Sequence, residues 1–169
     1  EFDAGTIVDS EGNPYNGVVA VEVTYVNPYD EKLAPGAPGD LQALAYPDDN
    51  TSKEANEPTQ LVSYGMADIT LYPEDCEEGD TECEEENLNL AEATSALVNM
   101  PIYNTDASIY EVAGGDELPS WSYNPDRGLW MEDGAGAVGS AEDGMVFEFE
   151  ATHFSWWNCD QGFTPTCAE

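Results

Sequence analysis

The stretch "GVVAVEVTYV" at residues 17–26 predicts a β-strand. Apolar side chains fall on every second position, whereas Glu22 and Thr24 fall between them. Because successive side chains of a strand point to opposite faces, this alternation predicts a half-buried strand with one apolar face. That face consists of Val19, Val21, Val23 and Tyr25. The preceding "EGNPYNG" is rich in turn-forming residues, so the strand is expected to begin after it.

Short apolar segments of this kind recur along the chain and are separated by turn-forming sequence. The chain contains 11 prolines and 15 glycines, which favours strands and turns over long helices. Residues 88–102 could form a helical turn, but Pro101 and the alternation of apolar residues favour two short strands. Further strands are expected at residues 41–46, at 61–72 with a bulge or bend near Gly65, and at 145–157.

Residues 118–134, "LPSWSYNPDRGLWMEDG", predict a hairpin. The "NPDRG" segment forms the turn, and Trp121 and Tyr123 on one arm face Trp130 on the other. For the tryptophans, packing in the core is the favoured role and stacking on a sugar is the alternative. The whole pattern gives about seven to nine strands at spacings typical of a sandwich. We therefore predict one all-β domain over residues 1–169, an Ig-like or Greek-key β-sandwich with long acidic loops. Its core spans about residues 12–160, and residues 161–169 form a tail.

The charge of the chain is strongly negative. Asp and Glu number 36 against 3 Lys and Arg, a formal net charge of -33. Small soluble domains usually carry a net charge of about 2 to 8. Such a surface repels nucleic acid and anionic lipid, so we predict neither as a partner. No apolar run reaches about 18 residues, so no membrane insertion is predicted. Salt-rich surroundings, a calcium-rich exterior or a cationic partner would each fit this charge.

The four cysteines form two local pairs. They are Cys76, Cys83, Cys159 and Cys167. Of the three possible connectivities, we favour disulfides 76–83 and 159–167, since each closes a short loop. Zinc binding is the alternative, but the spacing is not C-x-x-C. Disulfides would indicate an oxidising, extracytoplasmic location.

An acidic loop follows the strand predicted at 61–72. Its carboxylates are hard oxygen ligands, which calcium prefers. The spacing does not match an EF-hand, and a solvated acidic loop without metal is the favoured interpretation. The candidate calcium ligands are Asp75, Glu77, Asp80 and Glu82. No cofactor is predicted to be required, and calcium is the candidate stabilising ion.

Six short motifs occur in the order seen in a family of secreted bacterial surface domains. They are Gly17 to Val21, Pro38 to Asp40, Ser63 to Met66 with Ile69 and Leu71, Met100 to Ile102, Pro119 to Trp130 with Gly134, and the closing "HFSWWNCD" at 153–160. The chain resembles this family, whose members lie beside carboxypeptidase-regulatory-like or Ig-like repeats. It is distantly similar to parts of cartilage intermediate layer protein. The resemblance implies an extracellular β-sandwich module with no established chemistry.

The tripeptide His153-Phe154-Ser155 raises a second possibility. It resembles the cleavage sites of self-cleaving FIIND-type domains and of a self-cleaving nucleoporin. That resemblance implies that Ser155 attacks the carbonyl of Phe154, with His153 assisting either as a base or by holding the peptide strained. Under the alternative interpretation, which we favour, the segment closes the core. Phe154, Trp156 and Trp157 would then be packing residues.

Motifs of common enzymes are missing from the sequence. It has one His and no G-x-S-x-G, H-E-x-x-H or phosphate-binding loop, so we predict that the chain is not an enzyme. The predicted function is a non-catalytic surface, adhesion or assembly module, extracellular or at the cell surface. Its expected partners are a protein or carbohydrate there, or further copies of itself. The alternatives are a self-processing domain cut between Phe154 and Ser155, and a subunit of an extracellular filament or sheath.

Overall fold

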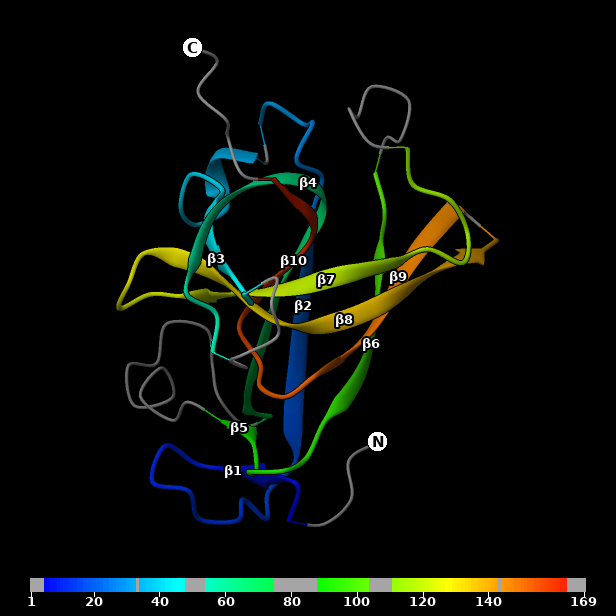
Figure 1. Ribbon diagram of the computed structural model, residues 1–169. Coiled ribbons are helices and arrows are strands. Elements are labelled where there is room, and N and C mark those ends of the chain that lie inside the picture. Colours follow the sequence, from blue (N-terminus) through cyan, green and yellow to red (C-terminus); the bar gives the residue numbers. More distant parts are fainter. Residues whose placement is uncertain are drawn as a thin grey trace.

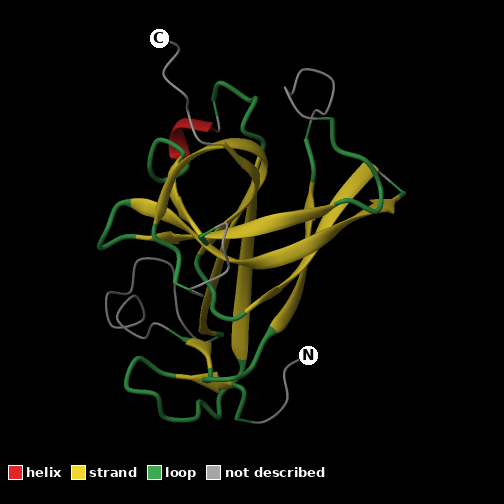
Figure 2. Ribbon diagram, in the orientation of Figure 1, coloured by secondary structure: helices red, strands yellow, loops and turns green. Residues whose placement is uncertain are grey.

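The computed structural model describes residues 5–32, 34–47, 54–74, 88–103, 111–142 and 144–163. These residues form ten β-strands and one short 3-10 helical turn at Ala34–Gly36 (Figures 1 and 2). The strands are β1 Ile7–Val8, β2 Val19–Val26, β3 Gln42–Ala45, β4 Glu57–Pro73, β5 Asn89–Leu90, β6 Ala96–Pro101, β7 Glu117–Asn124, β8 Leu129–Ala141, β9 Gly144–Ala151 and β10 Trp156–Phe163. The all-β prediction is confirmed. Within these residues, no helix is long and apolar enough to span a membrane.

Eight strands form one curved sheet. Its order is β2-β4-β10-β7-β8-β9-β6, and β3 pairs with both β4 and β8. The β3–β8 pair is parallel, whereas the other pairs are antiparallel. Strands β1 and β5 form a separate two-stranded sheet. Because β4 is 17 residues long, it pairs with β3 near its start and with β2 near its end. Figure 1 shows β4 curling over between these two parts.

The curvature encloses two hydrophobic cores, and together they give the fold its sandwich-like packing. The small core lies within the ring that β3, β4, β10, β7 and β8 close, and its buried members are Val26, Ala43, Leu61, Met66, Trp121 and Trp130. The large core includes Tyr64, Phe147, Phe149 and Trp157. Trp121, Trp130 and Trp157 are at most 1% exposed, so core packing is their role and they offer no face to a sugar.

Several predicted strands are confirmed, some with longer and some with shorter bounds. The hairpin of residues 118–134 is formed by β7 and β8, in which Tyr123 lies opposite Trp130 and contacts it edge to face, with 5.4 Å between ring centroids. Residues 88–102 form two short strands as expected. The bulge near Gly65 is also present, because the pairing of β10 with β4 shifts register between Cys159 and Asp160.

The strand predicted at 145–157 is wrong as a single element. The chain forms β9 up to Ala151, bends through residues 152–155, and begins β10 at Trp156. β9 then pairs with β8 and β6, whereas β10 lies between β4 and β7. One continuous strand could not occupy both places in the sheet.

The first strand forms as predicted, but its apolar face is only partly covered. Val21 and Val23 lie opposite Leu71 and Ile69 of β4, which are buried. Directly opposite residues of an antiparallel pair point to the same face. Val21 and Val23 are nevertheless 47% and 40% exposed. The reason is that β2 lies at the edge of the sheet and, among the described strands, pairs with β4 alone.

Candidate functional site

The bend at residues 152–155 lies at the wall of a surface cavity of about 560 Å³. Side chains from several parts of the fold meet there. They include Tyr46, Glu54, Ser122, Asp133, His153 and Ser155. All three residues of the tripeptide line this cavity, although the Phe154 side chain is buried.

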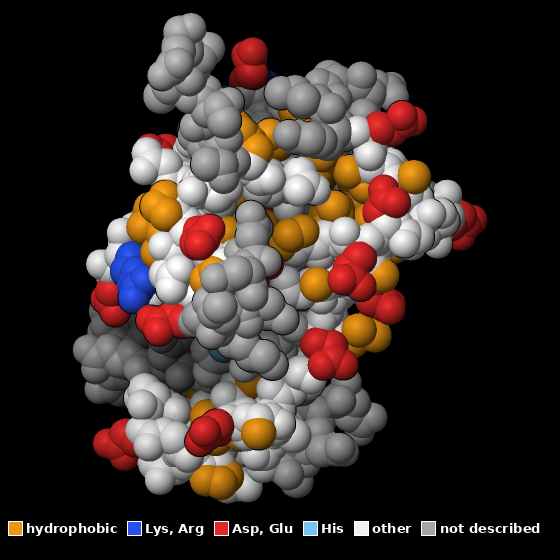
Figure 3. Space-filling view, in the orientation of Figure 1, with side chains coloured by type: hydrophobic (Ala, Val, Ile, Leu, Met, Phe, Trp, Pro, Cys, Tyr) orange, Lys and Arg blue, Asp and Glu red, His pale blue; other side chains and the backbone are white. Residues whose placement is uncertain are grey.

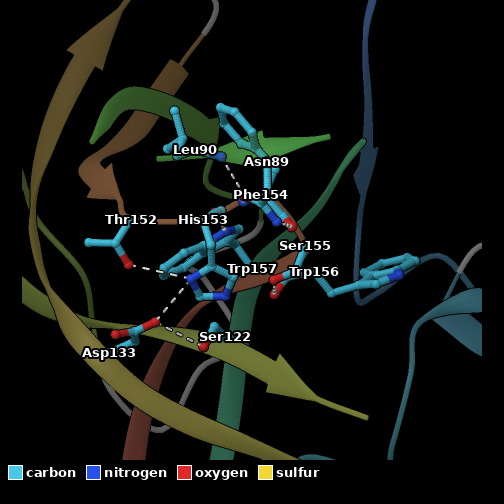
Figure 4. A network of polar contacts seen from close by, with 10 residues as sticks. All are labelled: Asn89, Leu90, Ser122, Asp133, Thr152, His153, Phe154, Ser155, Trp156 and Trp157. Atoms are coloured by element: carbon cyan, nitrogen blue, oxygen red, sulfur yellow. Dashed lines mark hydrogen bonds and ion pairs between the residues drawn. The ribbon is translucent and has the colours of Figure 1, made fainter. Parts of the chain in front are cut away.

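The side chain of Asn89 holds the peptide backbone at Phe154 (Figure 4). The N–H of Phe154 donates to Asn89 Oδ1 at 2.7 Å, and Asn89 Nδ2 donates to the carbonyl oxygen of Phe154 at 3.2 Å. Asn89 Oδ1 also accepts the N–H of Leu90 at 2.8 Å. On the other side of the bond, the carbonyl of Ser155 accepts the N–H of Ile69 at 3.1 Å. The Phe154–Ser155 segment is therefore fixed from both β5 and β4.

His153 faces an acidic side chain of β8. Its Nδ1 lies 3.6 Å from Asp133 Oδ2, and Asp133 accepts a hydrogen bond from Ser122 Oγ at 3.1 Å. The imidazole ring packs against Trp157, with 5.0 Å between ring centroids. Burial lowers the pKa of His153, and the nearby Asp133 opposes this effect. We therefore expect a neutral imidazole near pH 7.

The arrangement supplies only part of what peptide self-cleavage needs. That reaction requires a nucleophile, a base that reaches it, and a donor for the developing oxyanion. Asn89 Nδ2 is placed as such a donor, since it already contacts the Phe154 carbonyl. Ser155 Oγ donates to the carbonyl of Trp156 at 3.3 Å, whereas the His153 ring is turned toward Asp133 and Thr152 (Figure 4). Neither Phe154 nor Ser155 has a positive φ, and no described peptide bond is cis.

The predicted core role of this stretch is confirmed for most of its aromatic residues. Phe154 and Trp157 are buried in the large core, and Trp156 packs partly buried against the small core. The bend exists because Phe154 must turn inward while the chain passes from β9 to β10. Trp157 Nε1 donates to the His153 carbonyl at 3.1 Å, which stabilises the bend.

The structure does not support the predicted disulfide between Cys159 and Cys167. Cys159 is a free thiol, fully buried in the large core, where it pairs with Gly65 on one side and Ser120 on the other. Burial and the nearby Asp160 raise the pKa of this thiol. Three of the predicted disulfide residues, Cys76, Cys83 and Cys167, lie outside the described residues. The same holds for the candidate calcium ligands Asp75, Glu77, Asp80 and Glu82. In the part that is described, no three potential metal-binding side chains gather.

Ser63, Asn158 and Asp160 form a buried polar cluster next to Cys159, which the sequence did not predict. Asn158 Nδ2 lies 2.6 Å from Asp160 Oδ2, and Ser63 Oγ donates to Asn158 Oδ1 at 2.7 Å. All three side chains are buried, and Asp160 is fully so. Burial raises the pKa of Asp160 well above its ordinary value, although contacts with Ser63 and Tyr64 partly oppose this. Burial therefore favours the protonated, neutral form of this acid, which carries no unpaired buried charge.

Asn89 and Asp133 are the residues near the cavity that sequence reasoning missed. Asn89 lies 65 positions before Phe154, and Asp133 lies 20 positions before His153 in the middle of β8. No spacing rule connects residues so far apart, and with 36 acidic residues a single Asp carries no signal. Only the pairing of the strands brings these side chains to the bend.

The chain is similar to curated proteins of one kind, the cartilage intermediate layer proteins. No protein-family model matches the chain, and no solved structure matches it. Mouse cartilage intermediate layer protein 2 is 33% identical over 132 residues, which is 78% of this chain and 9% of the relative. The human protein 2 is 28% identical over 77% of this chain, again covering 9% of the relative. Pig cartilage intermediate layer protein 1 is 27% identical over 79% of this chain and 18% of the relative.

The chain thus spans less than a fifth of the length of these curated relatives. The distant resemblance to this group is confirmed, whereas the resemblance to bacterial surface domains stays a prediction. Over more than three quarters of its length, the chain is similar to one part of cartilage intermediate layer proteins.

Proposed function

We propose that the chain is a non-catalytic extracellular module that binds a protein or carbohydrate of the matrix or cell surface. The observation that carries this proposal is the similarity, over more than three quarters of the chain, to proteins named for a layer of cartilage. The fold supports it, because two aromatic cores and a continuous curved sheet form a rigid framework for surface loops.

The acidic surface supports a role in binding as well. Asp and Glu side chains are spread over the face shown in Figure 3, in keeping with the net charge of -33. Such a surface attracts cationic partners and divalent ions. We also propose calcium as an ion that stabilises the acidic stretch 75–84. As an alternative to binding another protein or a carbohydrate, the surface would bind further copies of the chain to form a filament.

Retention on a deposited matrix tests this function. The purified chain, fluorescently labelled, is added to decellularised matrix from cultured chondrocytes, and the retained fraction is measured after washing. We expect saturable retention that an excess of unlabelled chain displaces. A chain that washes off as fast as an unrelated acidic protein of equal charge would overturn the proposal.

A second candidate function is self-processing between Phe154 and Ser155. The observation that favours it is the hydrogen bond from Asn89 Nδ2 to the Phe154 carbonyl, the group that would be attacked. In the reaction, Ser155 Oγ adds to that carbon and the bond to the Ser155 nitrogen breaks. The nitrogen takes up a proton to leave an amine and an ester. Water then hydrolyses the ester, which frees the carboxyl of Phe154 and restores the Ser155 hydroxyl.

Prolonged incubation followed by denaturing gel electrophoresis tests this candidate. If this candidate is correct, wild type accumulates two fragments that meet between Phe154 and Ser155, and Ser155→Ala stays intact. Asn89→Asp keeps the acceptor for the Phe154 N–H but removes the donor to the carbonyl, so it should cleave more slowly. Wild type that stays intact throughout would rule out self-processing.

A further inference from the structure

Strand β2 offers a free edge with unusual composition. It pairs with β4 on one side, and among the described strands it has no partner on the other. Exposed edge strands are usually protected by charged residues, by proline or by a bulge. Along this edge Val21, Val23 and Tyr25 are 40% to 47% exposed, and Glu22 is the single charged residue of the strand.

The exposed side chains of β2 belong to the inner face of the sheet. Val21 and Val23 lie opposite Leu71 and Ile69, which are buried in the large core. A neighbouring strand at this edge would therefore continue the large core rather than cover solvent-facing polar residues. The apolar side chains of β2 pack against β4 on one side only, and a further strand on the other side would bury them.

The opposite edge of the sheet reaches β2 at one end. The sheet curves so far that Tyr25 Oη donates to the carbonyl of Asn99 in β6 at 3.1 Å. Just beyond, the N–H of Tyr103 donates to the carbonyl of Tyr64 in β4 at 2.7 Å. These contacts join the two edges near Tyr25. Toward Val21, the described residues show no hydrogen bond between β2 and β6, and the Val21 side chain is 47% exposed.

The outer face beside this edge is acidic. Glu22 points away from the large core, on the same face as Thr24 and its partner Asp68. Two carboxyls on one face repel each other, and the charge of Glu22 adds to burial in raising the pKa of Asp68. A cation placed beside Glu22 would relieve this repulsion. A second copy of this chain is disfavoured at the same place, because each copy carries a net charge of -33.

We propose that the free edge of β2 binds an extended segment of a partner protein, in which apolar residues alternate with Lys or Arg. The segment adds to the sheet as a further strand, so its backbone pairs with the N–H and C=O groups of β2 that point away from β4. Its apolar side chains contact Val21 and Val23, and its basic side chains lie beside Glu22. This inference deepens the proposed function and rests on it, since it names the class of partner that the module would bind.

A synthetic peptide tests the proposal directly. The probe is the capped, dye-labelled peptide KVKVKVK, and its controls are EVEVEVE and the block peptide KKKKVVV. Binding is followed by fluorescence anisotropy at about 0.15 M salt, where charges more than about 8 Å apart are largely screened. Backbone amide shifts in NMR spectra then locate the site. We expect KVKVKVK to bind most tightly and to shift the amides of β2.

A matched pair of charge reversals separates a specific site from general attraction. Glu22→Lys is expected to weaken KVKVKVK binding about tenfold, because it puts a like charge beside the basic side chains. Glu142→Lys makes the same change at an exposed residue in the turn between β8 and β9. The affinity for KVKVKVK should then stay within about twofold of that of wild type. Circular dichroism checks that both variants are folded.

Several outcomes would overturn the proposal. They are equal weakening by both variants, equal binding of the block peptide, amide shifts that avoid β2, and a dimer that pairs through β2 without peptide.

The matrix assay distinguishes failure of the β2 site from failure of the proposed extracellular binding function. Wild type retained on matrix but unable to bind the peptide would refute the edge site alone. Peptide binding without matrix retention would refute the extracellular binding role and leave the edge site in place.

Discussion

Replacing Asn89 by alanine tests how the bend before β10 is held. The Asn89 side chain makes three hydrogen bonds: it accepts from the N–H groups of Phe154 and Leu90, and it donates to the Phe154 carbonyl. Each such bond contributes about 1 kcal/mol net to stability, and unpaired groups that are partly shielded from water raise the cost. Asn89→Ala should therefore lower the free energy of unfolding by about 3 kcal/mol.

Urea denaturation followed by tryptophan fluorescence measures this change. Asn89→Asp keeps both acceptor roles and loses the donor to the carbonyl, so it should cost only about 1 kcal/mol. Asn16→Ala serves as the matched control, because Asn16 is exposed and makes one side-chain bond, to the Pro14 carbonyl. Its effect should be below about 0.5 kcal/mol. If Asn89→Ala is as stable as Asn16→Ala, the bend is held by the core alone and our account of it is wrong.

Four further predictions follow from buried groups and from the acidic stretch. Because the pKa of Asp160 is raised, the folded state keeps a proton that the unfolded state loses above about pH 3.8. The free energy of unfolding of wild type should therefore fall relative to that of Asp160→Asn as pH rises from about 4 to 7. If urea denaturation gives the same difference between the two proteins across this range, the acid is ionised in the folded state. Gly65→Ala should cost about 2 kcal/mol or more in thermal unfolding, because the new Cβ would collide with the Pro101 carbonyl, whereas an unchanged Tm would show that this approach is not tight. The thiol of Cys159 should resist iodoacetamide until urea unfolds the chain, and modification of the native protein, read by mass after digestion, would contradict its burial. Calcium at about 100 times its Kd should stabilise the chain by about 2.7 kcal/mol, and equal Tm values in calcium and in chelator would remove calcium from the proposal.

The fold class and most strands could be predicted from the sequence because they depend on local alternation and turn residues. The hairpin around residues 124–128 and the bulge at Gly65 are of this kind. The exposure of Val21 was not predictable in the same way. Alternation indicates which face of β2 is apolar, but only the position of β2 at the sheet edge decides whether another strand covers that face.

Only part of the candidate site could be predicted from the sequence. The tripeptide could be found because its three residues are adjacent, and the burial of Phe154 and Trp157 follows from their size and apolar character. Asn89 and Asp133 could not be found, since their roles arise from pairings between distant strands. The error at 145–157 has a similar cause, because the bend at residues 152–155 contains no Gly or Pro and is flanked on both sides by aromatic residues typical of strands.

Intact-mass spectrometry of the purified chain under denaturing conditions is the most direct test of the central claim, that this is a non-catalytic module. A module that binds without processing itself is expected to give one species at full-length mass, also after long incubation. Two fragments that meet between Phe154 and Ser155 would contradict that claim and make self-processing the function to pursue.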